Sequence, residues 1–463
     1  MSEAQAATSS CPGCAEWARR FADLETRVRE LEARLNRNSS NSSRPPSSDP
    51  PWQGALGGGG QGRQPGAQPG HPGHHRPRLP LEKVTQVIRH VPAHCEHCGQ
   101  ALPQDAGPQD GAPTWFQVAE LAEQPVSITE HQGHARTCLR CGRVTRQQLP
   151  AAVRAHTCGP RLTATISFLS ARCRCSRRRI VEILEAVLGL PLSLGTVSQS
   201  EAETSAALEP ACAQIFRAVR QAAAVNVDET GWYQRGKTCW LWMAASQQAA
   251  AFHIDPSRAL AGLRALLGEK PANLVTSDRW HTYNTLPMAQ RQFCWAHLQR
   301  EFQGCVERGG AAAKLGVAGL HASALLFESW HAFKAGRLDR KGLQAALEPI
   351  QQGLRQDLEE ARAGPKSKLT YFAGRLLAGY TALWAFSRVE GVEPTNNHAE
   401  RQLRSAVLWR KSSFGAHSEA GCRFVARALS VIQTLVLQGR PVLEYVTAAL
   451  TAHRANAAAP VLL

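Results

Sequence analysis

The sequence predicts a multidomain α+β protein, in which a coiled coil, a metal-binding domain and a helical region precede an α/β core with a helical insertion. Three observations predict this order. An apolar seam comes first, two C-x-x-C pairs follow, and three acidic residues stand in strand-end or helix settings in the second half. At 463 residues the chain is long enough for about two to four domains, each with its own core.

The composition points to a polyanionic partner. The formal net charge is +16 and the pI is near 9.6, which favours binding to nucleic acid. A membrane surface is the competing partner, but no stretch reaches about 18 uninterrupted apolar residues, and the N-terminus lacks the layout of a signal peptide. We therefore expect a cytoplasmic bacterial protein, nucleoid-associated when bound to DNA, with no membrane partner.

Residues 1–36 are expected to form a coiled-coil helix. Apolar residues alternate at spacings of four and three, as in an a/d seam, with charged residues between them. The alternative is an amphipathic helix packed on its own domain. Self-association is the preferred interpretation, and it predicts a homodimer or a higher oligomer. The seam consists of Trp17, Phe21, Leu24, Val28, Leu31 and Leu35.

Residues 37–80 are too rich in Ser, Pro, Gly and Gln to bury a core and predict a disordered linker. Residues 81–150 hold two C-x-x-C pairs, each followed by a glycine. Four thiolates suit a closed tetrahedral site for one structural Zn²⁺, and the segment between the pairs is expected to form strands. Redox-active or unrelated cysteines are the alternative. The expected ligands are Cys95, Cys98, Cys138 and Cys141.

Residues 155–215 have the outline of a helix-turn-helix. Ser176 is a helix cap, Gly189 a helix stop and Ser193 the next cap. Arg177 and Arg178 belong to a basic cluster suited to backbone phosphates. An ordinary helical hairpin is an equally good interpretation.

Residues 220–430 are expected to form the core. The strand signals read strand, strand, strand, helix, strand, which is the order of a ribonuclease-H-like α/β fold. A fifth strand then runs into a helix, and an Ala- and Leu-rich helical insertion follows at about 305–390. Residues 431–463 are expected to form a C-terminal helical tail.

Three acids carry the expected chemistry. Asp228 lies on the first, central strand, Asp278 follows the fourth strand, and Glu400 lies in an early turn of a later helix. Taken singly, each could be a cap or could pair with a neighbour, as Glu400 could with Arg404. Jointly, converging carboxylates predict a site for two Mg²⁺ or Mn²⁺ ions, which can catalyse phosphoryl transfer.

These motifs give the chain a resemblance to a known family. The DET, SDRWHTYN, CWAHLQREF and NNHAERQLR motifs, the NSSNSSRPPSSD linker and the SEAGCRFVARALSVIQT tail resemble those of the IS66 family of bacterial insertion-sequence transposases, of the TnpC type. The resemblance covers nearly the whole chain. It implies a DDE transposase, with Asp228, Asp278 and Glu400 holding two Mg²⁺ or Mn²⁺ ions.

The resemblance also implies partners and auxiliary residues. The partners would be terminal inverted repeats, target DNA and companion proteins of the TnpA and TnpB types. Cys294-x-x-His297 is similar to an element of several DDE groups; as a zinc site it would lack two ligands, so an active-site support or DNA-positioning role is preferred. A nuclease without strand transfer, a zinc-containing DNA-binding regulator and a structural zinc scaffold are the alternatives. The expected phosphate contacts are Arg300, Arg401, Arg404, Arg410 and Lys411.

Overall fold

The computed structural model divides into two compact units, Gly58–Glu130 by itself and Met1–Gly57 together with His131–Leu463. Most of the linker and Cys138 lie outside the described residues, so the predictions that fall on them stay predictions. The residues that the structure describes are 12–38, 42–44, 49, 78–103, 105, 114, 116–121, 125–137, 139–141 and 143–463.

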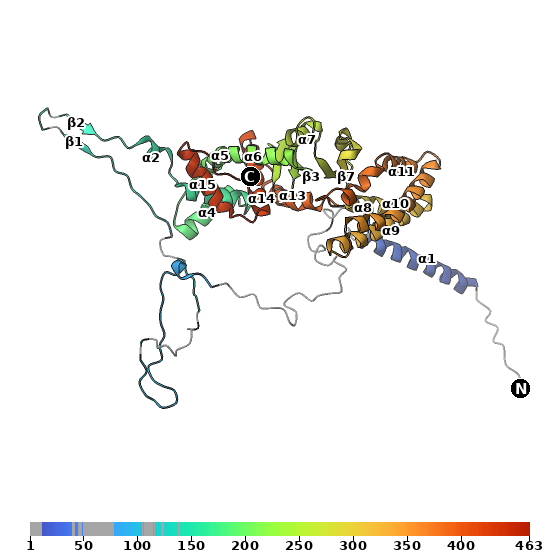
Figure 1. Ribbon diagram of the computed structural model, residues 1–463, viewed down its shortest axis with the longest axis horizontal. Helices are drawn as coiled ribbons and strands as arrows, with labels where there is room; N and C mark the ends of the chain where they lie inside the picture. The colour runs from blue at the N-terminus through green and yellow to red at the C-terminus, as the bar shows by residue number, and fades with distance from the viewer. Residues whose placement is uncertain are drawn as a thin grey trace. The chain divides into compact units, whose positions relative to one another are not determined.

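The N-terminal helix α1 spans Pro12–Leu35 (Figure 1). Ion pairs one turn apart, Glu16 with Arg20 and Glu25 with Arg29, lie along it. All six apolar side chains of the seam are between 46% and 83% exposed, so no other described part of the chain covers them. The helix is therefore present where the sequence predicts it, with its apolar face free.

The smaller unit contains little regular structure in its described residues. A single 3-10 turn, η3, spans Leu81–Lys83, and an isolated antiparallel bridge joins His94 to Ala101 around the first C-x-x-C pair. The strands expected between the two pairs are absent from the described residues up to His134. A short hairpin of β1 (Ala135–Thr137) and β2 (Val144–Arg146) follows in the larger unit.

Five helices lie between the β1–β2 hairpin and the sheet, and their caps lie where the sequence predicts them. Ser176 and Ser193 accept backbone hydrogen bonds from Arg179 and Thr196, and Gly189, with φ of +65°, ends the helix between them. Their small core consists of Cys158, Ile166, Ile180, Leu184 and Val197. The helices are α2 (Ala151–Ala155), α3 (Pro160–Ala171), α4 (Arg177–Leu188), α5 (Leu194–Ala207) and α6 (Glu209–Gln221).

The sheet has five strands in the order β5-β4-β3-β6-β7. β3, β4 and β5 are antiparallel neighbours, whereas β6 runs parallel to β3 and β7 parallel to β6. Arg235 and Gly236, both with positive φ, make the two-residue turn after β3, so the strand extends further than the sequence indicates. The strands are β3 (Ala224–Gln234), β4 (Lys237–Ala245), β5 (Ala250–Asp255), β6 (Leu274–Ser277) and β7 (Arg291–Phe293).

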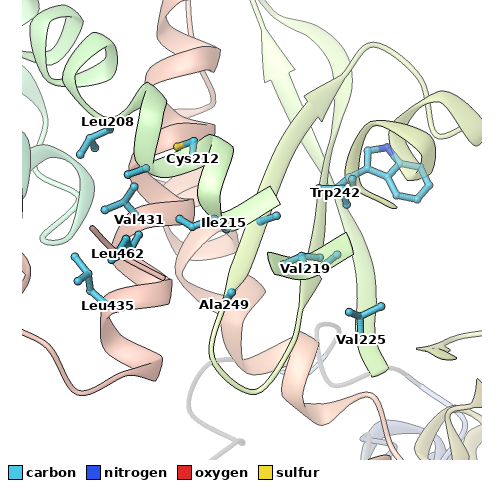
Figure 2. Packing of buried hydrophobic residues seen from close by; sticks show 14 of the residues in the cluster. Leu208, Cys212, Ile215, Val219, Val225, Trp242, Ala249, Val431, Leu435 and Leu462 are labelled. Carbon is cyan, nitrogen blue, oxygen red and sulfur yellow. The ribbon is translucent and has the colours of Figure 1, made fainter. Parts of the chain in front are cut away.

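Helices cover both faces of this sheet. Side chains of α6, α7 (Leu260–Leu267) and α15 (Val442–Arg454) pack on one face, and Figure 2 shows part of that core. α13 (Asn397–Ser413) packs on the other, while α14 (Glu419–Leu437) contributes to both cores. A Cβ atom at Gly262 of α7 would lie 2.2 Å from the Trp242 indole, so only glycine allows this close approach. Two 3-10 turns, η4 (His281–Thr285) and η5 (Met288–Gln290), lead into β7.

The helical insertion has its own core. Each of its long helices packs against the next one along the chain (Figure 1). Together they bury Leu326, Trp330, Leu347 and Phe386. The insertion lies between β7 and α13, so it separates Glu400 from the rest of the site in the sequence. The elements are α8 (Trp295–Arg308), α9 (Gly310–Lys334), α10 (Arg340–Ala363), α11 (Lys368–Ala378), η6 (Tyr380–Leu383) and α12 (Ala385–Arg388).

Two helices of the described chain, α9 and α14, are long and apolar enough to cross a membrane by length and composition alone. Core helices of soluble proteins pass the same test, so these two are weak evidence for a membrane span. In α14, 61% of the most apolar window is buried, and both helices contribute to hydrophobic cores.

Candidate functional site

Two of the three acids lie side by side at the centre of the sheet. In the parallel pair of β3 and β6, Asn226 is opposite Thr276. Asp228 and Asp278 each follow two residues later, and a period of two keeps them at the same level on the same face. Both side chains are half-buried.

The third acid reaches this point through the start of α13. Asn396, which is fully buried, donates from its side-chain amide to the carbonyl of Val227 at 2.9 Å and accepts from the Asn226 amide at 3.0 Å. Glu400 lies in the first turn of α13, four residues after Asn396. The helix that carries the third acid is thus tied to the strand that carries the first.

The other two acids influence Asp228 electrostatically. Burial raises the pKa of Asp228 well above its ordinary value, and the negative charges of Glu229, Asp278 and Glu400 raise it further. Among the described residues, no Lys or Arg lies within ion-pair distance of Asp228 or Asp278. Among the described residues, negative charge is therefore concentrated here without an ion pair to either carboxylate, although Arg291 donates to the Asp278 carbonyl at 3.2 Å; divalent cations would stabilise this arrangement.

Glu229, the neighbour that could have taken the place of Asp228, is buried elsewhere. Strand alternation turns it to the face opposite Asp228, together with Val225 and Val227. Tyr283 donates its hydroxyl to Glu229, and Arg258 Nε donates to Oε1 at 2.8 Å. Burial raises the pKa of Glu229, and the hydrogen bond from Tyr283 opposes this. The alternation of apolar and polar residues in VNVDET is the signal in the sequence that Asp228 and Glu229 face opposite sides of the sheet.

Cys294-x-x-His297 lies inside the same site. Cys294 caps α8, is fully buried, and its sulfur accepts a hydrogen bond from the Asn396 backbone at 3.1 Å. His297 Nδ1 lies 4.0 Å from Glu400 Oε1. Burial raises the pKa of Cys294 to about 11 and lowers that of His297. The sequence could not reveal this contact, because Cys294 and Glu400 are separated by the whole helical insertion.

The basic residues of α13 divide into two kinds. Arg410 donates to Thr230 Oγ1 at 3.1 Å and to the Gly231 carbonyl, so its guanidinium braces α13 against β3. The other three expected contacts are exposed, and Arg300, one turn after His297, is half-buried. The exposed residues are Arg401, Arg404 and Lys411.

The two arginines of the helix-turn-helix outline also differ. Arg177 donates from Nε and Nη2 to Glu201, at 2.9 and 2.6 Å, and Ser170 donates to the other oxygen of the same buried carboxylate. Its guanidinium is therefore used within the fold. Arg178 is exposed and lines an open hollow of about 440 Å³ between α4 and the start of α5.

The first C-x-x-C pair has the backbone of a metal knuckle. Gly99 has φ of +73°, and the Cys95 backbone pairs with Gln100 and Gly99 at 2.8 and 2.9 Å. Hydrogen bonds from the backbone of Cys98 and of His97 lower the pKa of Cys95. This environment favours a thiolate and fits a zinc ligand. Cys141 is exposed in the larger unit, and Cys138 lies outside the described residues.

Two family models match the chain. A family model described as Transposase IS66 family matches residues 156–423, which is more than half of the chain and includes all three acids. A second family model, described as a family of unknown function (DUF6444), matches residues 3–77. No curated protein matches the chain.

Proposed function

The chain belongs to the IS66 family of transposases, and on that premise we propose that it is the DNA transposase of a bacterial insertion sequence, cutting the element ends and joining them to target DNA. The family match carries this proposal, and two observations support it: the strand register puts Asp228 level with Asp278, and the charges of Asp278 and Glu400 both act on Asp228. The strand order, with β3 central and β6 parallel beside it, supports a ribonuclease-H-like catalytic core.

The carboxylates fit the metals that DDE chemistry requires. Asp228, Asp278 and Glu400 would hold two Mg²⁺ or Mn²⁺ ions, which prefer carboxylate oxygens and retain open positions for phosphate. Bound there, the ions would activate the attacking oxygen and stabilise the leaving oxygen of an in-line displacement. The mutual repulsion that raises the pKa of Asp228 supports this assignment, because cations would relieve it.

The chain's own residues position the acids and the DNA. Asn396 holds the start of α13 against β3 and so keeps Glu400 beside Asp228. Exposed Arg401, Arg404 and Lys411 on the same helix would bind backbone phosphates near the carboxylates, each contributing a modest and salt-sensitive part of the affinity. Arg178 would contact phosphates from the helical region, where Arg177 cannot because it pairs with Glu201.

The partners follow from the reaction. Two terminal inverted repeats must be held together, and the exposed seam of α1 offers a surface for pairing two copies of the chain. One structural Zn²⁺ on the four knuckle cysteines stays a prediction of the sequence, and the lowered pKa of Cys95 fits a zinc ligand. Companion proteins of the same element, of the TnpA and TnpB types, and a cytoplasmic site of action complete the proposal.

The test uses purified protein, labelled element ends and Mg²⁺, and compares wild type with Asp228→Asn, Asp278→Asn and Glu400→Gln. We expect each variant to bind the ends and to lose cleavage by about 10³-fold or more, since each removes several kcal/mol of transition-state stabilisation. Glu393→Gln is the matched control, because its carboxylate only makes a 3.6 Å pair with Lys334. Retained cleavage in all three acid variants would reject the triad.

The same assay separates the alternatives. A nuclease would release cut ends without joined products, and a DNA-binding regulator would bind fully without any metal-dependent cut. Strand-transfer products that depend on all three acids are the outcome expected of a transposase.

A further inference from the structure

Three side chains beside the catalytic acids form a donor set of a different kind. The sulfur of Cys294, an imidazole nitrogen of His297 and a carboxylate oxygen of Glu400 all lie within 4.8 Å of one another. Cys294 and His297 come from the first turn of α8, and Glu400 from the first turn of α13. Two helices that are distant in the sequence therefore bring three ligand types to one point.

This donor set is chemically unlike the site for Mg²⁺. Thiolate and imidazole are the ligands that Zn²⁺ prefers, whereas Mg²⁺ takes oxygen ligands and does not select sulfur. Three protein ligands with a water in the fourth position form a complete tetrahedral Zn²⁺ site of the open type. C-x-x-H supplies only two ligands in the sequence, and Glu400 provides the third in the fold.

The geometry needs little adjustment. Two tetrahedral ligands with bonds of about 2.1 Å stand roughly 3.4 Å apart. His297 Nδ1 and Glu400 Oε1 are 4.0 Å apart, and their side chains are 32% and 43% exposed, so both have room to approach a shared ion. His297 Nδ1 is itself buried and has no hydrogen-bond partner among the described residues. Buried polar atoms normally have a bonding partner, and a cation between this nitrogen and the carboxylate would supply one.

We infer that Cys294, His297 and Glu400 form a second metal site, which binds Zn²⁺ and, when filled, withdraws Glu400 from the catalytic Mg²⁺ site. Zinc would then inhibit DNA cleavage by the enzyme. Binding displaces the thiol proton of Cys294 as the Zn–S bond forms. Only the effect on cleavage rests on the proposed function; the binding itself does not.

Metal binding is measured on the full-length protein, by counting Zn²⁺ per chain after equilibration and by the near-ultraviolet thiolate absorption of bound Co²⁺. We expect Cys294→Ser and Glu400→Gln each to bind one equivalent fewer than wild type. Cys294→Ser should also lose part of the Co²⁺–thiolate absorption. Because the knuckle cysteines are unchanged in all these proteins, the difference does not come from the knuckle, and the loss of Co²⁺–thiolate absorption in Cys294→Ser assigns it to the second site.

Cys305→Ser is the matched control. Cys305 is also a fully buried cysteine of α8, but its sulfur contacts Arg308 at 2.7 Å and it is not part of the cluster. It should bind as many equivalents as wild type. Equal metal content in wild type and Glu400→Gln would overturn the inference. Because Glu400 is exposed, this comparison remains informative even if Cys294→Ser folds poorly.

Cleavage provides the second readout. Micromolar Zn²⁺ added to millimolar Mg²⁺ should abolish cleavage by wild type and by Cys305→Ser, and a zinc chelator should restore it. Cys294→Ser, compared with its own rate without zinc, should lose far less activity. If zinc binds as expected but leaves wild-type cleavage unchanged, the shared role of Glu400 is wrong. If no protein cleaves even without zinc, the proposed function fails while the metal count still stands.

Discussion

The side-chain amide of Asn396 donates a 2.9 Å hydrogen bond to the carbonyl of Val227, the residue before Asp228, across 169 positions of sequence. The Asn226 amide in turn donates to Asn396 at 3.0 Å, and the Asn396 backbone donates to Cys294. One fully buried residue therefore connects the strand of the first acid, the helix of the third acid and the C-x-x-H element.

We expect Asn396→Ala to lower the free energy of unfolding by about 2–4 kcal/mol, because it leaves buried polar groups on β3 without partners. It should also slow cleavage under conditions where the variant is fully folded, since Glu400 is no longer held beside Asp228. Denaturant unfolding and single-turnover cleavage measure the two effects. Asn397→Ala is the control, because Asn397 is exposed and should behave as wild type. Equal effects of the two variants would contradict the role given to Asn396.

Asp228→Asn should stabilise the protein at neutral pH, by about 0.5–2 kcal/mol, as removal of a strained site residue commonly does. The folded state raises the pKa of Asp228 above its ordinary value of 3.8. As the pH rises above about 3.8, the ionisation of Asp228 therefore lowers the free energy of unfolding. This loss stops growing above the pKa of Asp228 in the folded state. The gain should thus vanish at acid pH, and Mg²⁺ should stabilise wild type more than the variant.

Thermal unfolding across pH, with and without Mg²⁺, measures this prediction. Asp255→Asn on β5 is the control: its carboxylate faces His253 at 3.7 Å rather than other acids, so its removal should bring no stabilisation. A gain for Asp228→Asn that is as large at acid pH as at neutral pH would show that ionisation of Asp228 is not its cause.

Substitutions of Arg177 and Arg178 should have different effects, the first on stability and the second on DNA binding. Arg177→Ala leaves the buried Glu201 carboxylate without its cation and should cost about 1–3 kcal/mol of stability, less than a fully buried pair because Arg177 is half exposed. Arg178→Ala should change stability by less than about 0.5 kcal/mol. It should weaken DNA binding and reduce the salt slope by about one. Identical behaviour of the two variants in unfolding and in salt-dependent DNA binding would refute the distinction.

Leu24→Asp should dissociate the self-associated protein, because it places a charge in the exposed apolar seam of α1. Sedimentation of the full-length chain measures the oligomeric state. Thr26→Asp is the matched control: Thr26 is also exposed on α1 but lies off the seam, so it should leave association unchanged. An unchanged mass for Leu24→Asp would mean that the seam has a different partner.

Local features were predictable from the sequence because their causes are local. The caps at Ser176 and Ser193 and the left-handed Gly189 depend on residues within one turn. The strand signals gave the five strands of the sheet, but the turn after β3 proved shorter than expected. The strands expected between the two cysteine pairs are absent from the described residues up to His134, and β1 (Ala135–Thr137) forms directly before the second pair.

The long-range features were not predictable in this way. Nothing near Arg177 in the sequence indicates that Glu201 will hold it, and the same is true of Arg410 and the carbonyl of Gly231. The contact between His297 and Glu400 depends on the insertion folding as a separate bundle, which returns the chain to β3.

By itself, the sequence determined the elements, the family and the residue types available for metal chemistry, because periodicity, caps and motifs act over a few residues. Only the tertiary structure decided which of those residues share a site. Strand pairing puts Asp228 level with Asp278, and the packing of α13 on β3 brings Glu400 close to Cys294 and His297, since side-chain chemistry depends on distances that chain order does not fix.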